Sequence, residues 1–305
     1  MKIKILALAT IVAGTLFGAT RTEAIREKLV SGNRDYVFVA MHRGDWRNFP
    51  ENSKGAILSS IRLGADIVEL DVQMTKDGRF VLNHDKSLDR TTTGKGLVSD
   101  HTLAEIKTLK MLDRSGKPTG FDVLTLEEAL ELTRGKIIVN IDKFGMHPRE
   151  ILDAVEAAGA TKEVLVKARM PLAKAKEMFG PHWAKVESGE LLFMPIVHPR
   201  KDAAKGDGRM LAEYVAAAPR IAFMYEMCFD NPADVPDAVR RVPADMRIWV
   251  NTLWDSLSAK HSDMAALIDP EANWGWWLEN GATMIQSDYA AELIVWLSQK
   301  GRRNF

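Results

Sequence analysis

The sequence predicts an α/β protein, a closed (β/α)8 TIM barrel with a short insertion after its second barrel strand. Apolar runs of strand length alternate with helical segments from residue 36 to residue 298, and eight strands remain once a short extra one at 80–82 is set aside. Polar side chains directly follow these strands, at the end where such barrels carry their functional sites. A length of 305 residues is ordinary for one barrel.

The elements follow one another in a regular order. The predicted barrel strands span residues 36–41, 66–73, 136–142, 164–167, 191–197, 221–226, 247–251 and 282–286. Helices are expected at 53–62, 124–132, 148–157, 172–179, 209–218, 233–242, 262–268 and 290–298, and residues 22–33 form a helix or linker before the first strand. Ala56, Ile57 and Ile61 show helical spacing, and Thr125 with Glu128 forms a capping box.

The predicted insertion is the polar segment 86–118, with a short helix near 103–109. A connection this long inside a compact domain is usually functional. The turn sequence at 75–78, Thr-Lys-Asp-Gly, predicts a hairpin that leads from the second strand to the short strand at 80–82. No repeat or low-complexity linker divides the chain, so residues 25–305 are predicted to form one domain.

Composition excludes several classes of partner. The 41 basic residues (Lys and Arg) balance the 41 acidic residues (Asp and Glu), so nothing indicates binding to nucleic acid or to an anionic membrane. Cys228 is the single cysteine, which rules out an intrachain disulfide. The sequence does not indicate an oligomeric state.

The first 24 residues are predicted to be a secretory signal peptide. A short basic start is followed by an uncharged apolar run at 5–17 and then by small residues up to Ala24. The apolar run is shorter than the roughly 20 residues of a membrane span, although a buried helix or an anchor is the alternative. The mature protein is therefore expected in the periplasm or outside the cell, without stable membrane insertion.

Charged residues gather between residues 41 and 85. His42 follows the first strand, and His84 follows the short extra strand. Glu69 and Asp71 lie two apart on the second strand and must point the same way. Neighbouring carboxylates repel each other unless a cation lies between them or one takes up a proton, so this pair indicates a metal.

These residues belong to a series of motifs that resembles the glycerophosphodiester phosphodiesterase family. Order and spacing both match, densely over residues 37–100 and again at 248–252 and 281–289. The motifs are His42-Arg43-Gly44, Pro50-Glu51-Asn52, Glu69-Leu70-Asp71-Val72, Thr75-Lys76-Asp77-Gly78 and His84-Asp85 followed by Leu88-Asp89-Arg90-Thr91-Thr92.

The resemblance implies that His42 and His84 are the catalytic pair. Phosphodiester cleavage needs a base to activate the attacking oxygen and an acid to protonate the departing one. Imidazole titrates near neutral pH and serves in both roles. A single histidine after a strand is usually explained as a buried, hydrogen-bonded residue. Here, however, two histidines follow neighbouring strands.

The expected cofactor is a divalent cation, Mg²⁺ or Ca²⁺, since both prefer oxygen ligands. In the family the third acidic ligand comes from the third barrel strand, usually as a glutamate two residues before a lysine. This chain has Asp142 immediately before Lys143, and we expect Asp142 to join Glu69 and Asp71. Asp142 and Lys143 reach one site only if the strand ends or bulges there. The alternative is a structural network of these acids with Arg43 or Lys143.

The remaining predicted contacts concern the substrate. Arg43 and Lys143 are expected to bind phosphate oxygens, with Glu51 orienting His42 or Arg43. Trp254 and Phe144 are expected to wall the pocket. Asn52 is placed as the cap of the helix that begins at Ser53.

The predicted function is metal-dependent hydrolysis of a small glycerophosphodiester to glycerol 3-phosphate and an alcohol. A phospholipid-cleaving enzyme resembling sphingomyelinase D is one alternative, because that branch also has an aspartate on the third strand. A sugar phosphodiester is another possible substrate. A non-catalytic phosphate-ester receptor is a third reading, and both histidines argue against it.

Overall fold

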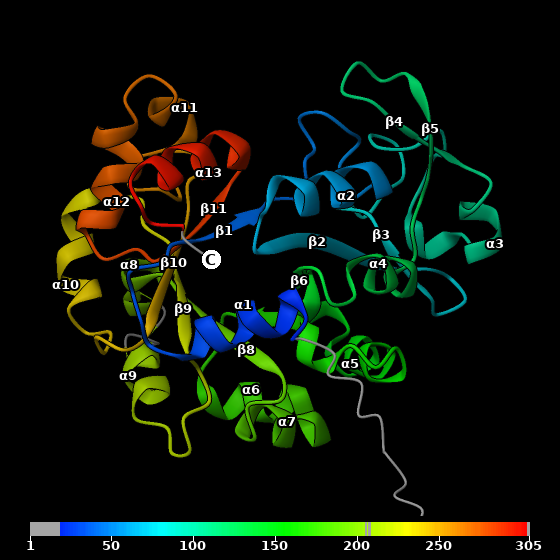
Figure 1. Ribbon diagram of the computed structural model, residues 1–305. Helices are drawn as coiled ribbons and strands as arrows, with labels where there is room; N and C mark the ends of the chain where they lie inside the picture. The colour runs from blue at the N-terminus through cyan, green and yellow to red at the C-terminus, as the bar shows by residue number, and fades with distance from the viewer. Residues whose placement is uncertain (1–18, 205, 207–208, 304–305) are drawn as a thin grey trace, which may run out of the picture.

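The computed structural model describes residues 19–204, 206 and 209–303 (Figure 1). Within this part of the chain, eight parallel strands form a closed barrel in which β1 pairs with both β2 and β11, so the predicted barrel is confirmed. The barrel strands are β1 (Phe38–Met41), β2 (Ile67–Met74), β6 (Ile138–Asp142), β7 (Val164–Ala168), β8 (Leu192–Val197), β9 (Met224–Met227), β10 (Arg247–Asn251) and β11 (Met284–Ser287).

Helices surround the barrel in the predicted order. Those foreseen from the sequence are α2 (Lys54–Leu63), α4 (Leu126–Thr133), α5 (Pro148–Ala157), α6 (Leu172–Phe179), α9 (Met210–Val215), α10 (Val235–Val239), α11 (Asp263–Ala266) and α13 (Ala290–Gln299). Further short helices were not foreseen, namely α7 (Trp183–Glu187), α8 (Pro199–Ala204) and α12 (Trp276–Glu279). The capping box of Thr125 and Glu128 is present at the start of α4.

Alternation along the strands decides which side chains enter the barrel. Phe38 and Ala40 of β1 belong to the buried cluster inside the barrel, whereas Val37, Val39 and Met41 belong to the cluster between barrel and helices. The same alternation continues past the end of β1 at Met41. It therefore points His42, the next residue in phase with Phe38 and Ala40, toward the mouth.

Helix α1 (Arg21–Val30) closes the opposite end of the barrel. Its buried residues Ile25 and Leu29 pack with the interior cluster. Thr20 caps the helix in a capping box with Glu23. The apolar run at 5–17 lies outside the described residues, and the expected cleavage site near Ala24 falls within α1.

The insertion after β2 is folded on a small core of its own (upper right in Figure 1). It contains β3 (Phe80–Leu82), which pairs antiparallel with β2 through the predicted turn, then α3 (Leu103–Ile106) and a hairpin of β4 (Lys110–Leu112) and β5 (Pro118–Asp122). The hairpin was not predicted. Its second strand is largely exposed, so it lacks the buried alternation from which a strand is recognised.

None of the helices among the described residues is both long enough and apolar enough to cross a membrane.

Candidate active site

Three carboxylates meet at the mouth of the barrel. Glu69, Asp71 and Asp142 each place an oxygen within 4.8 Å of the others. The register of the sheet produces this arrangement, because Asp71 on β2 lies directly beside Asp142 on β6. Burial, together with the charges of Asp71 and Asp142, raises the pKa of Glu69 well above its usual value. Burial would raise the pKa of Asp142 as well, but Lys167 and Lys143 bring it below its usual value, so the excess negative charge of the cluster is concentrated at Glu69 and Asp71.

The strand end at Asp142 explains how two adjacent residues reach one site. Strand β6 ends at Asp142, and Lys143 adopts the left-handed conformation with φ 60°. The Lys143 ammonium therefore turns back to lie 3.5 Å from Asp142 and 3.8 Å from Asp71. It also lies 3.4 Å from Nε2 of His84. The condition set by the sequence, that the strand must end there, is met.

His42 is held by an aspartate from the last barrel strand. Its Nδ1 lies 2.7 Å from a carboxylate oxygen of Asp288, and the same oxygen accepts a hydrogen bond from the indole of Trp46 at 2.6 Å. The backbone N–H of Asp288 donates in turn to the buried Asp263 at 2.8 Å. Burial raises the pKa of Asp263 to about 6. His42 is only 8% exposed, so its ring has little freedom to turn away.

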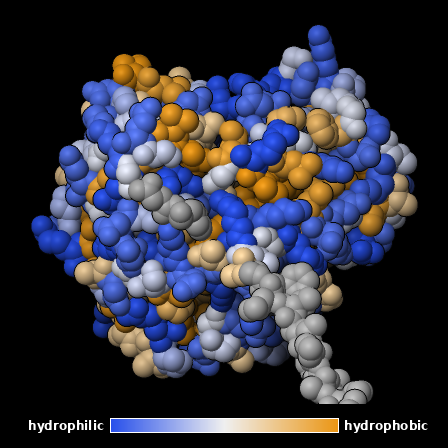
Figure 2. Space-filling model, in the orientation of Figure 1, coloured by the Kyte–Doolittle hydropathy of each residue, from blue (hydrophilic) through white to orange (hydrophobic). Residues whose placement is uncertain are grey.

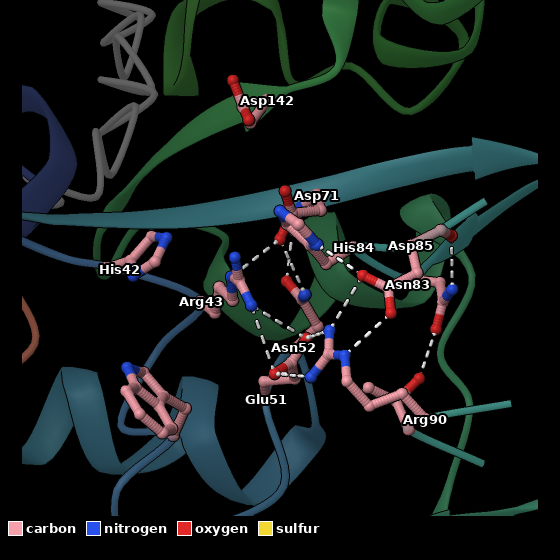
Figure 3. Close-up of polar contacts among 12 residues, drawn as sticks. His42, Arg43, Glu51, Asn52, Asp71, Asn83, His84, Asp85, Arg90 and Asp142 are labelled. Atoms are coloured by element: carbon pink, nitrogen blue, oxygen red, sulfur yellow. Dashed lines mark hydrogen bonds and ion pairs between the residues drawn. The ribbon is translucent and has the colours of Figure 1, made fainter. Parts of the chain in front are cut away.

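His84 is held by its own neighbour and by the insertion. Its Nδ1 lies 2.7 Å from Asp85, and Asp85 accepts hydrogen bonds from Arg90 at 2.7 and 3.0 Å (Figure 3). These hydrogen bonds with Arg90 and His84 keep the pKa of Asp85 well below its usual range. Both histidines are therefore bound through Nδ1 to a carboxylate, and Nε2 of His84 lies 3.4 Å from the Lys143 ammonium.

Glu51 joins two arginines rather than a histidine. Both of its oxygens accept hydrogen bonds from Arg90 at 2.8 Å, and Arg43 lies 3.2 Å away. Burial alone would raise the pKa of Glu51, but Arg90 and Arg43 outweigh it and bring the pKa below its usual value. Of the two roles expected for Glu51, the structure contains the contact with Arg43 and, among the described residues, none with His42.

Arg43 contacts the acid cluster through its backbone and its side chain. With φ at 53°, its N–H donates to Glu69 at 2.8 Å, while Nε lies 3.6 Å from Asp71. Gly44 follows with φ 71°, and a Cβ there would come within 2.9 Å of the backbone of Ala56. The motif therefore needs glycine at this position, because any side chain would collide with α2.

Asn52 binds Asp71 instead of capping a helix, so the expected cap was wrong. Its side chain donates to Asp71 at 3.0 Å and accepts from the Asp71 backbone N–H at 3.1 Å. Ser53 is the cap of α2, since its hydroxyl accepts from the N–H of Ala56. Asn52 has φ 60°, a conformation that asparagine tolerates better than most residues.

A second polar layer supports the cluster from inside the barrel. The ammonium of Lys167 is buried, 3.1 Å from Glu226 and 3.7 Å from Asp142. Burial would lower the pKa of Lys167, but Glu226 and Asp142 raise it above its usual value. Glu226 also accepts a hydrogen bond from Asn251 at 2.8 Å. This network links β7, β9 and β10 to the site.

The two aromatic residues expected to line the pocket lie in different environments. Trp254 is 47% exposed and meets the His42 ring edge to face, with 6.3 Å between centroids. Phe144 is 1% exposed and packs against Phe179 between barrel and helices, so its prediction as a pocket wall was wrong. The position of Phe144 after the end of β6 suggested the mouth, but the turn at Lys143 directs it outward.

Comparison with known proteins divides the chain into two parts. The model of the glycerophosphoryl diester phosphodiesterase family matches residues 42–182, and a model described only as a domain of unknown function matches residues 193–297. Both parts belong to one closed barrel, and Asp288, which binds His42, comes from the second.

Two curated relatives carry the name glycerophosphodiester phosphodiesterase. The one from Caldanaerobacter subterraneus subsp. tengcongensis is 44% identical over 134 residues, which is 43% of this chain and 52% of that protein. The one from Bacillus subtilis is 38% identical over 157 residues, which is 48% of this chain and 49% of that protein. The chain thus spans about half the length of the curated relatives it matches.

Solved structures share the fold over nearly the whole chain. A glycerophosphoryl diester phosphodiesterase from Parabacteroides distasonis has a TM-score of 0.70 and 21% identity, covering 90% of this chain and 92% of that one. A phosphodiesterase from Oleispira antarctica, solved with its product sn-glycerol-3-phosphate, has a TM-score of 0.62 and 19% identity, covering 86% and 96%.

The family match includes both histidines and all three clustered carboxylates. Over residues 42–182, the chain is thus similar to the glycerophosphoryl diester phosphodiesterase family.

Proposed function

We propose that this protein hydrolyses glycerophosphodiesters to glycerol 3-phosphate and an alcohol. The observation that carries the proposal is the meeting of two histidine–aspartate pairs and a cluster of three carboxylates at one rim of the barrel. The named relatives support the same activity, as does the product bound to the Oleispira antarctica enzyme.

His42 and His84 are proposed as the general acid and base. Figure 3 draws them on the two sides of Arg43. One ring accepts a proton from the attacking hydroxyl group, and the other donates a proton to the departing alkoxide. The carboxylates at Nδ1 favour the tautomer with its proton on that nitrogen, and they stabilise the ring when it is charged.

Glu69, Asp71 and Asp142 are proposed to bind a divalent cation, Mg²⁺ or Ca²⁺. The fit rests on their oxygens, which lie close together, and on an oxygen of Asp71 that is buried without a hydrogen bond among the described residues. Such a cation, when bound, would stabilise negative charge on the phosphate oxygens. Burial and the charges of Asp71 and Asp142 raise the pKa of Glu69, and a bound cation would relieve the repulsion among the three carboxylates.

Arg43 and Lys143 are proposed to contact the phosphate. The Nε of Arg43 is buried and has no hydrogen-bond acceptor among the described residues. The Lys143 ammonium lies 3.5 Å from Asp142 and 3.4 Å from Nε2 of His84. Both groups are thus fixed beside the expected position of a phosphate oxygen before substrate arrives.

Replacement of either histidine tests the proposal. We expect His42→Ala and His84→Ala to lower the rate of glycerol 3-phosphate release at least about 1,000-fold, because each removes a proton-transfer group. Circular dichroism should show an intact fold. His101→Ala is the matched control, since His101 lies on the insertion with its Nδ1 on a backbone carbonyl, and it should retain activity. Substantial activity in either site variant would defeat the assignment.

One surface feature favours intact lipid as a second candidate substrate. Met264, Leu267 and Ile268 on and after α11 are 60%, 42% and 89% exposed, and Figure 2 shows apolar side chains in this region. Met264 lies 3.3 Å from the hydroxyl of Tyr289, the residue after Asp288, so this surface adjoins the site. Comparing a phospholipid in mixed micelles with its deacylated form separates the candidates, and faster cleavage of the micellar lipid would favour the second.

We propose that the protein is exported by its N-terminal segment. The support is the basic start and the apolar run at 5–17. Fractionation of producing cells, followed by N-terminal sequencing, tests this, and recovery of the chain in the cytoplasm with its first residues intact would contradict it.

A further inference from the structure

Two adjoining cavities lie beside the site, between residues 46–51 and the turn of the β4–β5 hairpin. Their volumes are about 460 and 490 Å³, within the range of small-ligand pockets. Pro50, Asp113, Arg114 and Ser115 line both of them. We call the two together the arginine cleft, because Arg47, Arg90 and Arg114 line it.

The walls of the arginine cleft lead directly to both catalytic pairs. Trp46, on one wall, donates to the Asp288 oxygen that binds His42. Arg90, on the other, donates to the Asp85 that binds His84. One aspartate thus separates the cleft lining from each histidine, so an alcohol that extends from the phosphate past either pair would reach the cleft.

Two guanidinium groups in the cleft have no acidic partner. Arg47 and Arg114 make no hydrogen bond or ion pair with any of the described residues, and both lie against aromatic rings. Arg47 is 3.7 Å from the centre of the Tyr289 ring, and Arg114 is 5.1 Å from that of Trp46. By contrast, Arg90 is fully engaged with Glu51 and Asp85.

The two acidic residues of the cleft make contacts of different kinds. Glu51 is bound by Arg90 and Arg43. Asp113 accepts three hydrogen bonds, from the N–H and hydroxyl of Ser115 and from the N–H of Lys117, at 2.7 to 2.9 Å. These bonds fix the hairpin turn and thereby the backbone of Arg114. Asp113 forms no ion pair among the described residues, so its one negative charge is outnumbered by those of Arg47 and Arg114, and the cleft keeps a net positive charge.

The Trp46 ring in the cleft is unsuited to a quaternary ammonium group. Such a group binds over a free aromatic face. The ring of Trp46 has Arg114 at 5.1 Å and Arg47 at 5.8 Å from its centre, so cations already lie against it. A further cation would be repelled, whereas an anion would be attracted by both arginines.

We propose that the arginine cleft binds the leaving alcohol and selects an alcohol that carries its own phosphate group over one that carries a quaternary ammonium. Arg114 and Arg47 are the specificity-determining residues. This inference rests on the proposed phosphodiesterase function and names the substrate class that the site prefers.

The test compares substrates that differ in one group. Glycerophosphoinositol and glycerophosphoinositol 4-phosphate differ by a single phosphate on the leaving alcohol, and glycerophosphocholine supplies the quaternary ammonium. We expect kcat/KM to be highest for the phosphorylated substrate and lowest for glycerophosphocholine. In Arg114→Gln, the ratio of kcat/KM between the two inositol substrates should fall about five- to tenfold, as expected for one lost charge-assisted contact.

Lys117→Gln is the matched control, because it removes the same charge from the same hairpin turn but not from the cleft lining. It should leave the ratio unchanged. Equal ratios in the wild type and Arg114→Gln, or preference for glycerophosphocholine, would overturn the inference while leaving the phosphodiesterase proposal intact.

A binding measurement separates the two proposals if no diester is cleaved. Calorimetric titration of the wild type with inositol 4-phosphate alone should detect binding that weakens about five- to tenfold in Arg114→Gln. Binding without turnover would refute the proposed function but support the cleft. Absence of binding, or equal binding in both proteins, would refute the inference about the cleft.

Discussion

The side chains that hold the two histidines come from different distances along the chain. His84 takes its aspartate from the next residue, whereas His42 takes Asp288 from 246 residues away. Both arrangements give the same result, a carboxylate at Nδ1. An aspartate in this position fixes the tautomer and the orientation of the ring, so its removal should impair catalysis without unfolding the protein.

We predict that Asp288→Asn lowers kcat for glycerophosphodiester cleavage about 10- to 100-fold, because the amide no longer stabilises a charged His42 ring. The pH–rate profile should also change, because the carboxylate no longer stabilises the charged ring, whereas a purely structural role would leave the profile unchanged. Glu292→Gln, an exposed acid on α13, is the control and should match the wild type. An unchanged kcat and profile in Asp288→Asn would show that Asp288 does not position His42.

The residues of the site itself were easier to predict from the sequence than the residues that hold them in place. His42, His84, Glu69 and Asp71 follow or lie on predicted strands in closely spaced motifs, and Asp142 ends a predicted strand. The role of Asp288 was missed, although its place after a strand was a usable signal, because pairing over 246 residues depends on barrel closure. The role of Arg90 was missed because its bridge to Glu51 requires the folded insertion.

Among the elements, the end of β6 matters most for the site. Lys143 reaches Asp71, Asp142 and His84 only because its backbone is left-handed. This conformation costs roughly 1–2 kcal/mol for a residue with a Cβ and almost nothing for glycine.

A pair of variants separates the backbone of Lys143 from its charge. Lys143→Ala and Lys143→Gly both remove the ammonium, so both should lose most activity. The glycine variant should be more stable than the alanine variant by about 1 kcal/mol, since only alanine retains the strain. Urea denaturation at pH 7 measures the difference. Equal stability, or a more stable alanine variant, would contradict the left-handed conformation at the strand end.

Elements with a buried face were predictable and exposed ones were not. Strand β10 and helices α5 and α6 have the bounds expected from their apolar patterns. Strands β4 and β5 pair mainly with each other at the surface, where no alternation marks them. Helix α7 has five residues and α12 has four, too few for a helical period to stand out.

At the scale of the whole molecule, Arg90 links the insertion to the barrel. It bridges Glu51, which precedes α2, and Asp85, which follows β3. The pKa values of both acids lie below their usual values, with Arg90 contributing to each shift. Groups with lowered pKa values stabilise the folded state above their unfolded pKa values, near 4, and lose this contribution as the pH falls further.

We therefore predict that Arg90→Gln lowers the free energy of unfolding by about 1 kcal/mol between pH 5 and pH 8. The difference from the wild type should shrink as the pH falls below about 4, when Glu51 and Asp85 become protonated in both proteins. Urea denaturation across this range is the measurement. Lys95→Gln removes a weaker 3.9 Å pair within the insertion and should differ little from the wild type throughout. A difference in the free energy of unfolding that increases as the pH falls would contradict the stabilising role of the Arg90 ion pairs.

The closed barrel also explains why the two segments matched by separate family models, residues 42–182 and 193–297, contribute side chains to one site. The family model ends at residue 182, yet Lys167 pairs with Glu226 and His42 pairs with Asp288 across that boundary. Closure of the sheet between β1 and β11 brings the two parts together. The proposed chemistry is therefore a property of the whole barrel.

The most direct test of the proposed chemistry is ³¹P NMR of glycerophosphoglycerol incubated with the purified protein. With Mg²⁺ or Ca²⁺ present, the diester resonance should be replaced by that of glycerol 3-phosphate, a chelator should stop the reaction, and restored cation should restart it. A diester resonance that persists with either cation, or a reaction that continues unchanged under chelation, would contradict a cation-dependent phosphodiesterase at this site.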